Sequence, residues 1–566
     1  MHPLQAAALD RDEVQYLNEN EGVEYVGDES CRACHASQYD SFKGTGMGRS
    51  MSLPSRDKRL GEFDKPATFQ DPKTRLWYST FERNGKFHHR LYKLDARGRV
   101  ILSEDHPIAY AVGSGDHGRS YLVARGNFLF ISPLSWYTLG RKWDLSPGND
   151  IGIYEGFSRE AGDLCISCHS GLPRPIPGAV NQYRQPVFQI MTIGCERCHG
   201  PGELHVKQRR VGAPIEGATD RTIVNPAKLT GELRDDVCFQ CHLAGDARVP
   251  RPGKHPLDFR PGSYLDNTVA VFSVPLNLKG GSFLALNQTD QIQMSRCRLP
   301  NGEALNCITC HDPHKQLHGQ MAAEFFNSRC LQCHNVQSCT AAGKLRQATS
   351  PPDNCTSCHM PRRKVVNIGH TALTDHRIPK SSNVAEKSYV ILSPDPATNL
   401  IWETKPPGAQ EPDLRTLALA FAQLASDYPG YGAKGFPLLV QAAQKFPGDP
   451  EVQATYAEVL LAARPSSDFR ELARAALERS IAAGSKSPLV RRRLGELLAE
   501  MGGPRALEYL KEAVELDPYD PANYLALANV EVSLGQTANA ERTMRKLVEI
   551  SPANEDARHF LEQSKR

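Results

Sequence analysis

The sequence repeats one short pattern, in which two cysteines stand three positions apart and a histidine directly follows the second. The pattern occurs seven times and uses fourteen of the sixteen cysteines. Random placement at this composition predicts about 0.015 matches, so chance does not explain the repetition. We number the motifs 1 to 7 in chain order: Cys31-Cys34-His35, Cys165-Cys168-His169, Cys195-Cys198-His199, Cys238-Cys241-His242, Cys307-Cys310-His311, Cys330-Cys333-His334 and Cys355-Cys358-His359.

Each motif has the residue types and the spacing that attach a haem covalently. Two thiols at this spacing can each add to one vinyl group of the porphyrin, and the adjacent histidine then ligates the iron. The sequence therefore predicts seven covalently bound haems c, attached through all fourteen motif cysteines. The expected iron ligands on this side are the motif histidines: His35, His169, His199, His242, His311, His334 and His359.

Three other uses of paired cysteines fit the sequence less well. Zinc ribbons need C-x-x-C pairs two by two or distant histidine pairs, and they give no reason for a histidine after every second cysteine. Seven is also an odd number, which counts against pairing. A disulfide framework is typical of short secreted chains, and a thioredoxin-like C-x-x-C is expected once, near a βαβ pattern.

An iron with one histidine ligand has an open sixth position, and the group that fills it decides between electron transfer and catalysis. Twelve histidines lie outside the motifs, so all seven irons can in principle be six-coordinate. These histidines are His2, His88, His89, His106, His117, His205, His255, His314, His318, His370, His376 and His559.

Several stretches of the chain, taken in order, resemble one protein family. They are "CRACHASQYDSFKGTGMGRS", "GSGDHGRSYL", "WDLSPG", "CERCHGPGELH", "CITCHDPHK", and "CTSCHMPRR" followed by "HTALTDHRI". Together they resemble multihaem cytochromes of the superfamily that includes hydroxylamine oxidoreductase and the small tetrahaem cytochrome that accepts its electrons. The match is to members with C-terminal tetratricopeptide repeats, and it covers most of the chain. It implies short helices and loops around stacked haems.

The resemblance also implies a set of distal iron ligands. Relatives carry them in G-S-G-x-H, C-H-G-P-G-x-x-H, C-H-D-P-H and H-x-x-x-x-x-H. The corresponding residues of this chain are His117, His205, His314, His370 and His376. Relatives commonly have a further histidine shortly after the first motif, where this chain has Met47. A thioether ligand there would raise the potential of haem 1, and ordinary loop packing of Met47 is the alternative.

One haem then has no assigned partner, and His318, His255 and His106 compete for it. His88 and His89 are consecutive in an expected strand and point to opposite faces, so at most one of them can reach a haem.

Two histidines and two cysteines are not expected to bind a haem. His2 and His559 lie outside the haem region and are expected on the surface. Cys297 and Cys339 lie outside the motifs and form either a disulfide or two unrelated buried thiols.

The elements that position the motifs begin with two expected hairpins. "RLWYSTFERNGKFHHRLYKL" alternates apolar and polar residues around Asn84-Gly85, which is a strong hairpin-turn signal. A second hairpin is expected to turn at Gly126-Asn127. We therefore expect a small antiparallel β insertion over residues 65–145.

The motifs lie on both sides of this insertion. Residues 1–64 form an N-terminal arm with the first motif, and residues 146–380 hold the six others between Pro- and Gly-rich loops. A region so poor in regular elements needs another core, and the porphyrins are expected to supply it. The expected fold class is a multihaem cytochrome c fold with a β insertion and an all-α C-terminal domain.

Residues 381–412 read as a Pro-rich linker, and residues 413–566 contain no cysteine and have a helical pattern. Pro518 and Pro552 are 34 residues apart, which is the tetratricopeptide repeat length. Residues at the repeat's spacing are Tyr524, Leu527, Ala528, Gly535 and Ala540. The repeats serve either as a peptide-binding groove or as a solvated cap that packs on the cytochrome.

Charge and composition limit the partners and the compartment. The formal net charge of +3 gives no reason to expect a nucleic-acid partner. Seven haems bring fourteen propionates and change this value to about −11 with ferrous irons and about −4 with ferric irons. Haem attachment to thiols takes place outside the cytoplasm, so we expect a periplasmic or extracellular location. "MHPLQAAALD" has no signal-peptide pattern, and no apolar run is long enough to span a bilayer.

The leading expectation is an electron carrier that conducts between redox partners docked at different ends of the haem array. One alternative is an enzyme that acts on a small nitrogen or sulfur compound at an open haem iron. No motif is followed by the lysine of the C-x-x-C-K sites in related nitrite and tetrathionate reductases. The other alternative is a subunit of an extracellular cytochrome assembly that the repeats join together.

Overall fold

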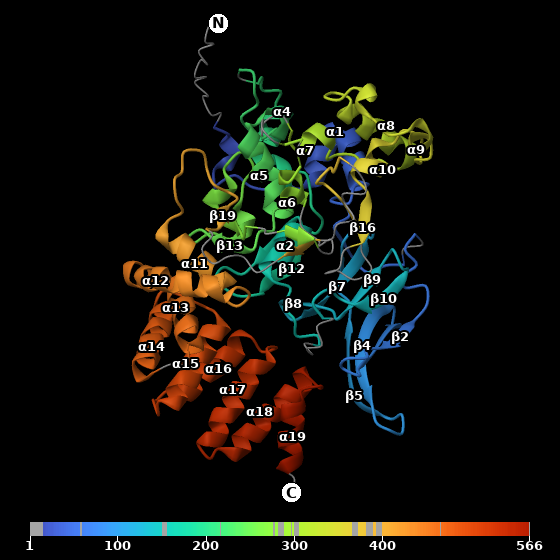
Figure 1. Cartoon of the computed structure of the whole chain (residues 1–566). Helices are drawn as coiled ribbons and strands as arrows, with labels where there is room; N and C mark the ends of the chain where they lie inside the picture. The colour runs from blue at the N-terminus through green and yellow to red at the C-terminus, as the bar shows by residue number, and fades with distance from the viewer. Residues whose placement is uncertain are drawn as a thin grey trace.

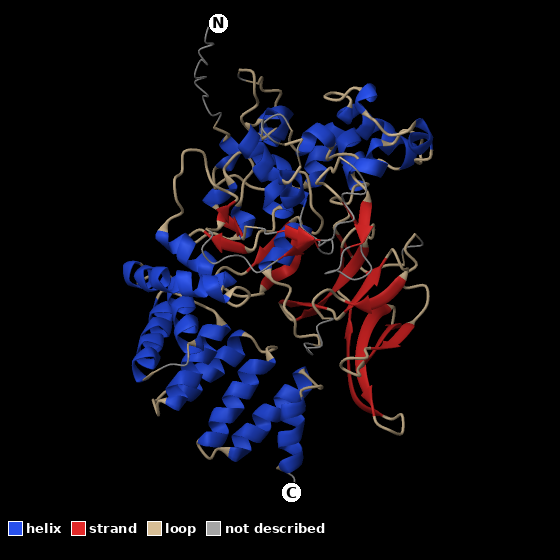
Figure 2. Cartoon of the chain, in the orientation of Figure 1, coloured by secondary structure: helices blue, strands red, loops and turns tan. Residues whose placement is uncertain are grey.

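The computed structural model places three regions side by side. Figure 1 shows motif-bearing helices at the top, antiparallel strands at the lower right and a row of helices at the lower left. Figure 2 shows further short strands in the middle of the molecule. The structure describes residues 15–56, 59–149, 156–215, 217–275, 278–280, 288–295, 297–298, 305–364, 372–380, 389–391, 399–463 and 466–564.

Short helices carry the motifs, and most of them are too short to be stable without tertiary packing. The motif-bearing helices are α1 (Asp28–Lys43), α2 (Asp163–His169), α3 (Glu196–His199), α5 (Gly231–His242), α7 (Cys307–Cys310), α8 (Gly319–Cys330) and α10 (Cys355–His359). Between them lie α4 (Glu203–Arg210), α6 (Gln288–Gln293), α9 (Gly343–Gln347) and the 3-10 turns η1 (Leu17–Glu19), η2 (Pro226–Lys228), η3 (Pro256–Asp258), η4 (Leu265–Asn267) and η5 (Val336–Ser338).

A four-stranded antiparallel sheet contains the first expected hairpin. Its strands pair in chain order and are β2 (Ala67–Gln70), β3 (Trp77–Arg83), β4 (Lys86–Leu94) and β5 (Val100–Pro107). Arg83 pairs with Lys86 across a two-residue turn, in which Asn84 and Gly85 have φ angles of 52° and 71°. A type I′ turn requires positive φ at both positions, so the predicted hairpin is confirmed.

A second antiparallel sheet packs against the first. Its strands are β1 (Met51–Ser52), β6 (Tyr110–Val112), β7 (Gly118–Arg125), β8 (Phe128–Ile131), β9 (Leu134–Tyr137) and β10 (Lys142–Leu145). The hairpin predicted at Gly126-Asn127 joins β7 to β8, with Arg125 opposite Phe128. The two sheets share a core that includes Leu91, Tyr121 and Trp143.

Further strands lie within residues 146–380, where short helices and loops were expected, and two more lie within residues 381–412, where a linker was expected. They form small antiparallel sheets of β11 (Leu172–Pro175) with β12 (Tyr183–Ile190), β13 (Ala247–Pro250) with β14 (Val269–Ser273) and β19 (Ile401–Trp402), β15 (Leu278–Gly280) with β18 (Tyr389–Ile391), and β16 (Arg362–Lys364) with β17 (Ala372–Thr374). Several contain proline, such as Pro173, Pro186 and Pro250. Proline removes a backbone donor and interrupts the alternating pattern, so these strands have no strong signal in the sequence.

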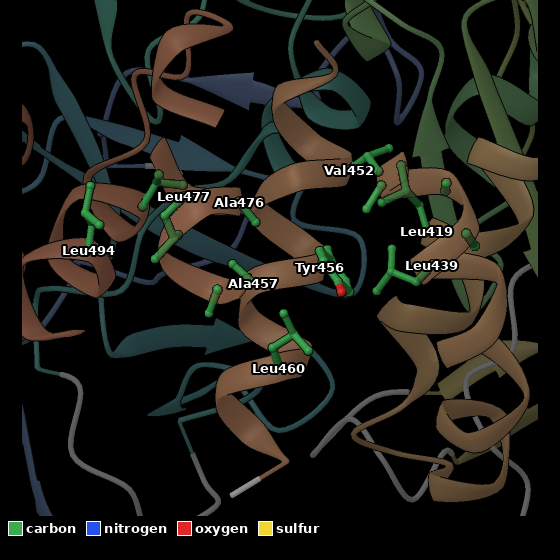
Figure 3. Packing of buried hydrophobic residues seen from close by; sticks show 14 of the residues in the cluster. Leu419, Leu439, Val452, Tyr456, Ala457, Leu460, Ala476, Leu477 and Leu494 are labelled. Atoms are coloured by element: carbon green, nitrogen blue, oxygen red, sulfur yellow. The ribbon is translucent and has the colours of Figure 1, made fainter. Parts of the chain in front are cut away.

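The C-terminal region is a row of helices that pack consecutively against one another. They are α11 (Leu414–Leu424), α12 (Pro429–Lys445), α13 (Pro450–Ala462), α14 (Ser467–Ala482), α15 (Pro488–Glu500), α16 (Ala506–Leu516), α17 (Pro521–Ser533), α18 (Thr537–Ile550) and α19 (Glu555–Gln563). Figure 3 shows their shared core, to which Leu419, Leu439 and Val452 contribute from the successive helices α11, α12 and α13. Within the described residues, no helix combines the length and the apolar character that crossing a membrane requires.

Both ends of this helical row pack on the rest of the molecule. At one end the core continues from α11 onto β14 through Phe272. Toward the other end, Arg125 donates from Nη2 to the Ile550 carbonyl oxygen of α18 at 3.1 Å, and its guanidinium lies 4.4 Å from the ring centre of Tyr519, between α16 and α17. Nearby, Lys93 and Glu555 form a 2.9 Å ion pair. The helical row therefore contacts both the motif region and the β region and connects them.

Candidate functional site

The motifs form short helical turns that place their reactive side chains on one face. Residues three positions apart in a helix are neighbours on its surface, so the two thiols of each motif can meet one ligand. Asparagine caps two of these turns: Asn306 accepts from the Thr309 N–H at 3.1 Å, and Asn354 accepts from the Thr356 N–H at 3.1 Å. These caps satisfy backbone donors that a free helix start leaves unpaired.

Three motif histidines each face a second imidazole from a distant part of the chain. The ring centres of His35 and His205 are 6.5 Å apart, with an interplanar angle of 23°. His199 and His314 are 6.0 Å apart at 22°.

The third pair is His311 and His376, whose ring centres are 6.2 Å apart at 31°. An imidazole nitrogen lies roughly 2 Å from a metal that it ligates and about 1 Å from its own ring centre. Two imidazoles on opposite sides of one metal therefore have ring centres about 6 Å apart. All three pairs have the ring-centre separation expected of two imidazoles on one iron.

Hydrogen bonds orient several of these imidazoles through Nδ1. His199 Nδ1 lies 2.8 Å from the Val224 carbonyl oxygen, and His376 Nδ1 lies 3.0 Å from that of Thr374. When Nδ1–H donates to an oxygen, Nε2 carries the free lone pair that a metal needs. Burial lowers the pKa of His199, which favours this neutral form.

Thiols of different motifs lie close enough to shift each other's pKa. The pairs are Cys31 with Cys195, Cys168 with Cys241, Cys238 with Cys307, and Cys330 with Cys355. Helix α5 also contacts α3, and α7 contacts α8. The motifs therefore follow one another in space in the order 1, 3, 4, 5, 6 and 7, with motif 2 beside motif 4.

Several arginines near the motifs have a buried Nε–H donor without a partner. The Nε atoms of Arg197, Arg234, Arg248 and Arg329 are buried and make no hydrogen bond. A buried donor without a partner costs free energy, so an acceptor is expected there. The carboxylates of haem propionates are acceptors of the right charge. Thiol pairs, facing imidazoles and unused guanidinium donors thus all fit a covalently bound haem.

Two carboxylates tie motif 1 to motif 3. Asp28, at the start of α1, accepts the Cys195 N–H at 2.9 Å. Glu196, inside motif 3, accepts the N–H groups of Val26 and Gly27 at 2.9 Å and 2.8 Å. Sequence reasoning missed both residues. The available signal was their acidity directly at a motif, where a carboxylate can cap a helix start.

The other predicted distal ligands do not take part in an imidazole pair. Met47 is half-buried in the turn after α1, and the ring that faces His35 is that of His205. His117 is positioned by Arg362, whose Nη2 lies 3.2 Å from its Nδ1. His370 lies outside the described residues.

Two of the three histidines that compete for the last haem, His255 and His106, have other partners. His255 uses both ring nitrogens, with Nε2 3.0 Å from Asp163 and Nδ1 accepting the Leu257 N–H at 3.2 Å. His106 lies 2.9 Å from Glu104. These contacts are those of structural histidines.

The pair of consecutive histidines on β4 occupies two different environments. His88 contacts Asp105 at 3.1 Å, whereas His89 contacts Ser132 at 2.7 Å and is fully buried. Opposite faces of the strand explain the difference. His318 stands directly before α8 as its N-terminal flanking residue.

Cys297 and Cys339 are exposed free thiols in the structure. Among the described residues, no three His, Cys, Asp or Glu side chains converge on one point as a metal-binding group.

Comparison with known proteins supports two parts of the sequence interpretation. Residues 503–563 match the tetratricopeptide repeat family, so the C-terminal region contains such a repeat. The C-type polyheme cytochrome OmcC of Geobacter sulfurreducens is 24% identical over 227 residues, which are 37% of this chain and 27% of that protein. The chain thus matches only about a quarter of the length of that relative.

Similar solved structures cover only part of the chain. MamA is 15% identical with a TM-score of 0.23, over 25% of this chain and 81% of that chain. YrrB, described as a TPR protein with an unusual peptide-binding site, is 20% identical with a TM-score of 0.23, over 25% of this chain and 74% of that chain.

Proposed function

We propose that the chain is a heptahaem c-type cytochrome that conducts electrons between redox protein partners. The observation that carries this proposal is the separation of about 6 Å in the three imidazole pairs, which suits one iron per pair. The weak similarity to a polyhaem cytochrome supports the same role. The order of the motif stretches further favours the hydroxylamine oxidoreductase superfamily.

The proposal assigns a distal ligand to each paired motif. His205 completes motif 1, His314 completes motif 3 and His376 completes motif 5. His205 replaces Met47 at motif 1 because it is the residue that faces His35.

One of the remaining predicted ligands has an assigned motif. We assign His117 to motif 7, because its partner Arg362 follows that motif's His359 by three residues. Met47 and His370 stay predicted ligands without an assigned motif, and motifs 2, 4 and 6 have no assigned partner.

A bound haem supplies a one-electron carrier at each motif. Each of the three histidine pairs would offer an iron two imidazole ligands, so its coordination would not need to change between redox states. The motifs lie next to one another in the order 1, 3, 4, 5, 6 and 7, which places the carriers in a continuous series. Electrons can therefore enter near motif 1 and leave near motif 7, or travel in reverse. Thiol attachment of haem implies a periplasmic or cell-surface location.

In this proposal the main role of the repeats is structural: they connect the motif region to the β region, because the helical row packs on both. Docking of a partner protein or of identical subunits remains a second role. Concentration-dependent assembly of the full chain, followed by analytical ultracentrifugation, would support that second role.

Mass spectrometry and absorption spectroscopy of the intact protein test the proposal. The expected mass exceeds that of the polypeptide by seven haems, with a strong Soret band and reduced α band. Replacing Cys355 and Cys358 by alanine should remove one haem, whereas replacing Cys297 by alanine should remove none. A polypeptide mass without attached tetrapyrrole would refute the cytochrome function.

Carbon monoxide titration separates an electron carrier from an enzyme with open irons. Six-coordinate haems resist carbon monoxide, so we expect binding at no more than one haem per chain. Uptake by two or more haems would favour catalysis on a small nitrogen or sulfur compound.

A further inference from the structure

The two residues between the cysteines of a motif report how that motif is packed. Both cysteines and the histidine turn toward the ligand, so the intervening residues lie on the other face of the turn. In motif 1 these residues, Arg32 and Ala33, are exposed. The intervening residues of motifs 2, 3 and 4 are all buried: Ile166, Ser167, Glu196, Arg197, Phe239 and Gln240. Motifs 2, 3 and 4 thus form a buried centre.

Arg197 of motif 3 is the hydrogen-bonded link of this centre. Its Nη2 donates to the Ser167 carbonyl of motif 2 at 2.9 Å. Its own carbonyl accepts from Gln240 Nε2 of motif 4 at 2.9 Å. Both hydrogen bonds are buried, and Arg197 is only 8% exposed. One residue therefore connects three motifs.

The charge of Arg197 also reaches all three motifs. Its guanidinium interacts electrostatically with the thiols of Cys168, Cys198 and Cys241, one from each motif of the centre. Its Nε is buried without a hydrogen-bond partner. The carboxylate of the adjacent Glu196 accepts three backbone N–H groups, from Val26, Gly27 and Gly202. Those bonds direct Glu196 toward motif 1.

We propose that Arg197 is a positioning residue that holds motifs 2, 3 and 4 together and raises the reduction potential of the haems attached there. This inference rests on the proposed cytochrome function. A haem loses one positive charge on reduction, so a nearby buried cation favours the reduced form. Water and salt screen an exposed cation much more strongly. The central haems are therefore the preferred electron positions of the array.

Redox titration of three full-length variants tests the inference. Arg197→Gln keeps hydrogen-bond donors but removes the charge, so the central haems should become about tenfold harder to reduce, or about 59 mV lower per electron. Arg197→Lys keeps the charge and should restore the wild-type potentials. Arg32→Gln is the matched control, because Arg32 occupies the same kind of position in motif 1 and its side chain is 53% exposed. It should leave the titration unchanged.

Haem content separates the two proposals. A fully loaded Arg197→Gln protein with wild-type potentials would overturn the role of Arg197 and leave the cytochrome function intact. An equal fall at all haems would also overturn it, because the effect is expected only at the centre. If Arg197→Gln does not fold, Arg197→Lys still tests the inference. This variant keeps the positive charge, so central haems that become tenfold harder to reduce in it would contradict the inference. Absence of haem from the wild-type protein would instead refute the proposed function.

Discussion

The paired histidines come from distant parts of the chain, and their chemistry depends on the contacts that each ring makes in the fold. His35 and His205 are far apart in the sequence, yet their rings face each other at a distance that suits one iron. His205 is held by Asp220, whose carboxylate lies 3.0 Å from its Nδ1. A carboxylate in this position fixes the ring and makes Nε2 a better ligand.

Removing the His205 side chain should leave one haem iron without its sixth ligand. In His205→Ala, we expect one additional haem per chain to bind carbon monoxide, because the iron of motif 1 loses its sixth ligand. Absorption spectroscopy of the reduced protein measures the difference. His255→Ala is the control, since both ring nitrogens of His255 already have partners. Equal carbon monoxide binding in both variants would contradict the assignment.

At the scale of elements, close packing of helices decides where small residues are needed. Gly495 lies in α15 where the next helix passes close by. A Cβ at this position would lie 2.6 Å from Cγ of Leu510 and 3.0 Å from the Ala506 carbonyl oxygen. Glycine therefore sets the distance between α15 and α16.

Enlarging this residue should destabilise the helical row. We expect Gly495→Leu to lower the free energy of unfolding by about 1–3 kcal/mol, because the added atoms force the two helices apart. Chemical denaturation followed by circular dichroism measures the effect. Gly448→Ala is the control, because nothing lies within 4 Å of the added Cβ, and a change of no more than about 0.5 kcal/mol is expected. Similar stability of the two variants would show that α15 and α16 are not in contact.

The sequence predicts elements unequally. The turn at Asn84-Gly85 is recognisable because that residue pair suits positive φ, and the tetratricopeptide repeat is recognisable by its period. The sequence does not predict strands such as β11, because Pro173 and Pro175 interrupt the alternating pattern of a strand. Their pairing depends on distant partners, which local residue preferences do not encode.

The candidate site could also be predicted only in part from the sequence. Attachment cysteines and motif histidines follow from local spacing. The pairing of His199 with His314 and the link from Arg197 to Ser167 are tertiary contacts, and no local pattern specifies them.

At the scale of the whole molecule, two carboxyl groups meet where the helical row packs on the motif region. Glu160 precedes α2 and Asp517 follows α16. Burial, together with the nearby charge of Asp517, raises the pKa of Glu160 from 4.5 to about 7. The folded state therefore keeps a proton that the unfolded chain releases.

This proton makes stability depend on pH. Because the folded pKa is raised, the contribution is full below about pH 4.5 and is lost as the pH rises to about 7. With allowance for solvent screening, we expect a loss of about 2 kcal/mol. Thermal unfolding at pH 5 and pH 8 measures it.

Glu160→Gln should remove this part of the pH dependence, because an amide does not titrate in this range. Glu555→Gln, at the exposed pair with Lys93, should leave it in place. Wild-type pH dependence in Glu160→Gln would assign the effect to other groups.

The contacts that close the helical row onto the β region also set an order of folding events. Lys93 and Glu555 are 462 positions apart, and Arg125 and Ile550 are 425 positions apart. The ribosome must synthesise all of the residues between the two partners before either contact can form. Until the helical row has been made, the strands that carry Lys93 and Arg125 therefore have part of their surface uncovered.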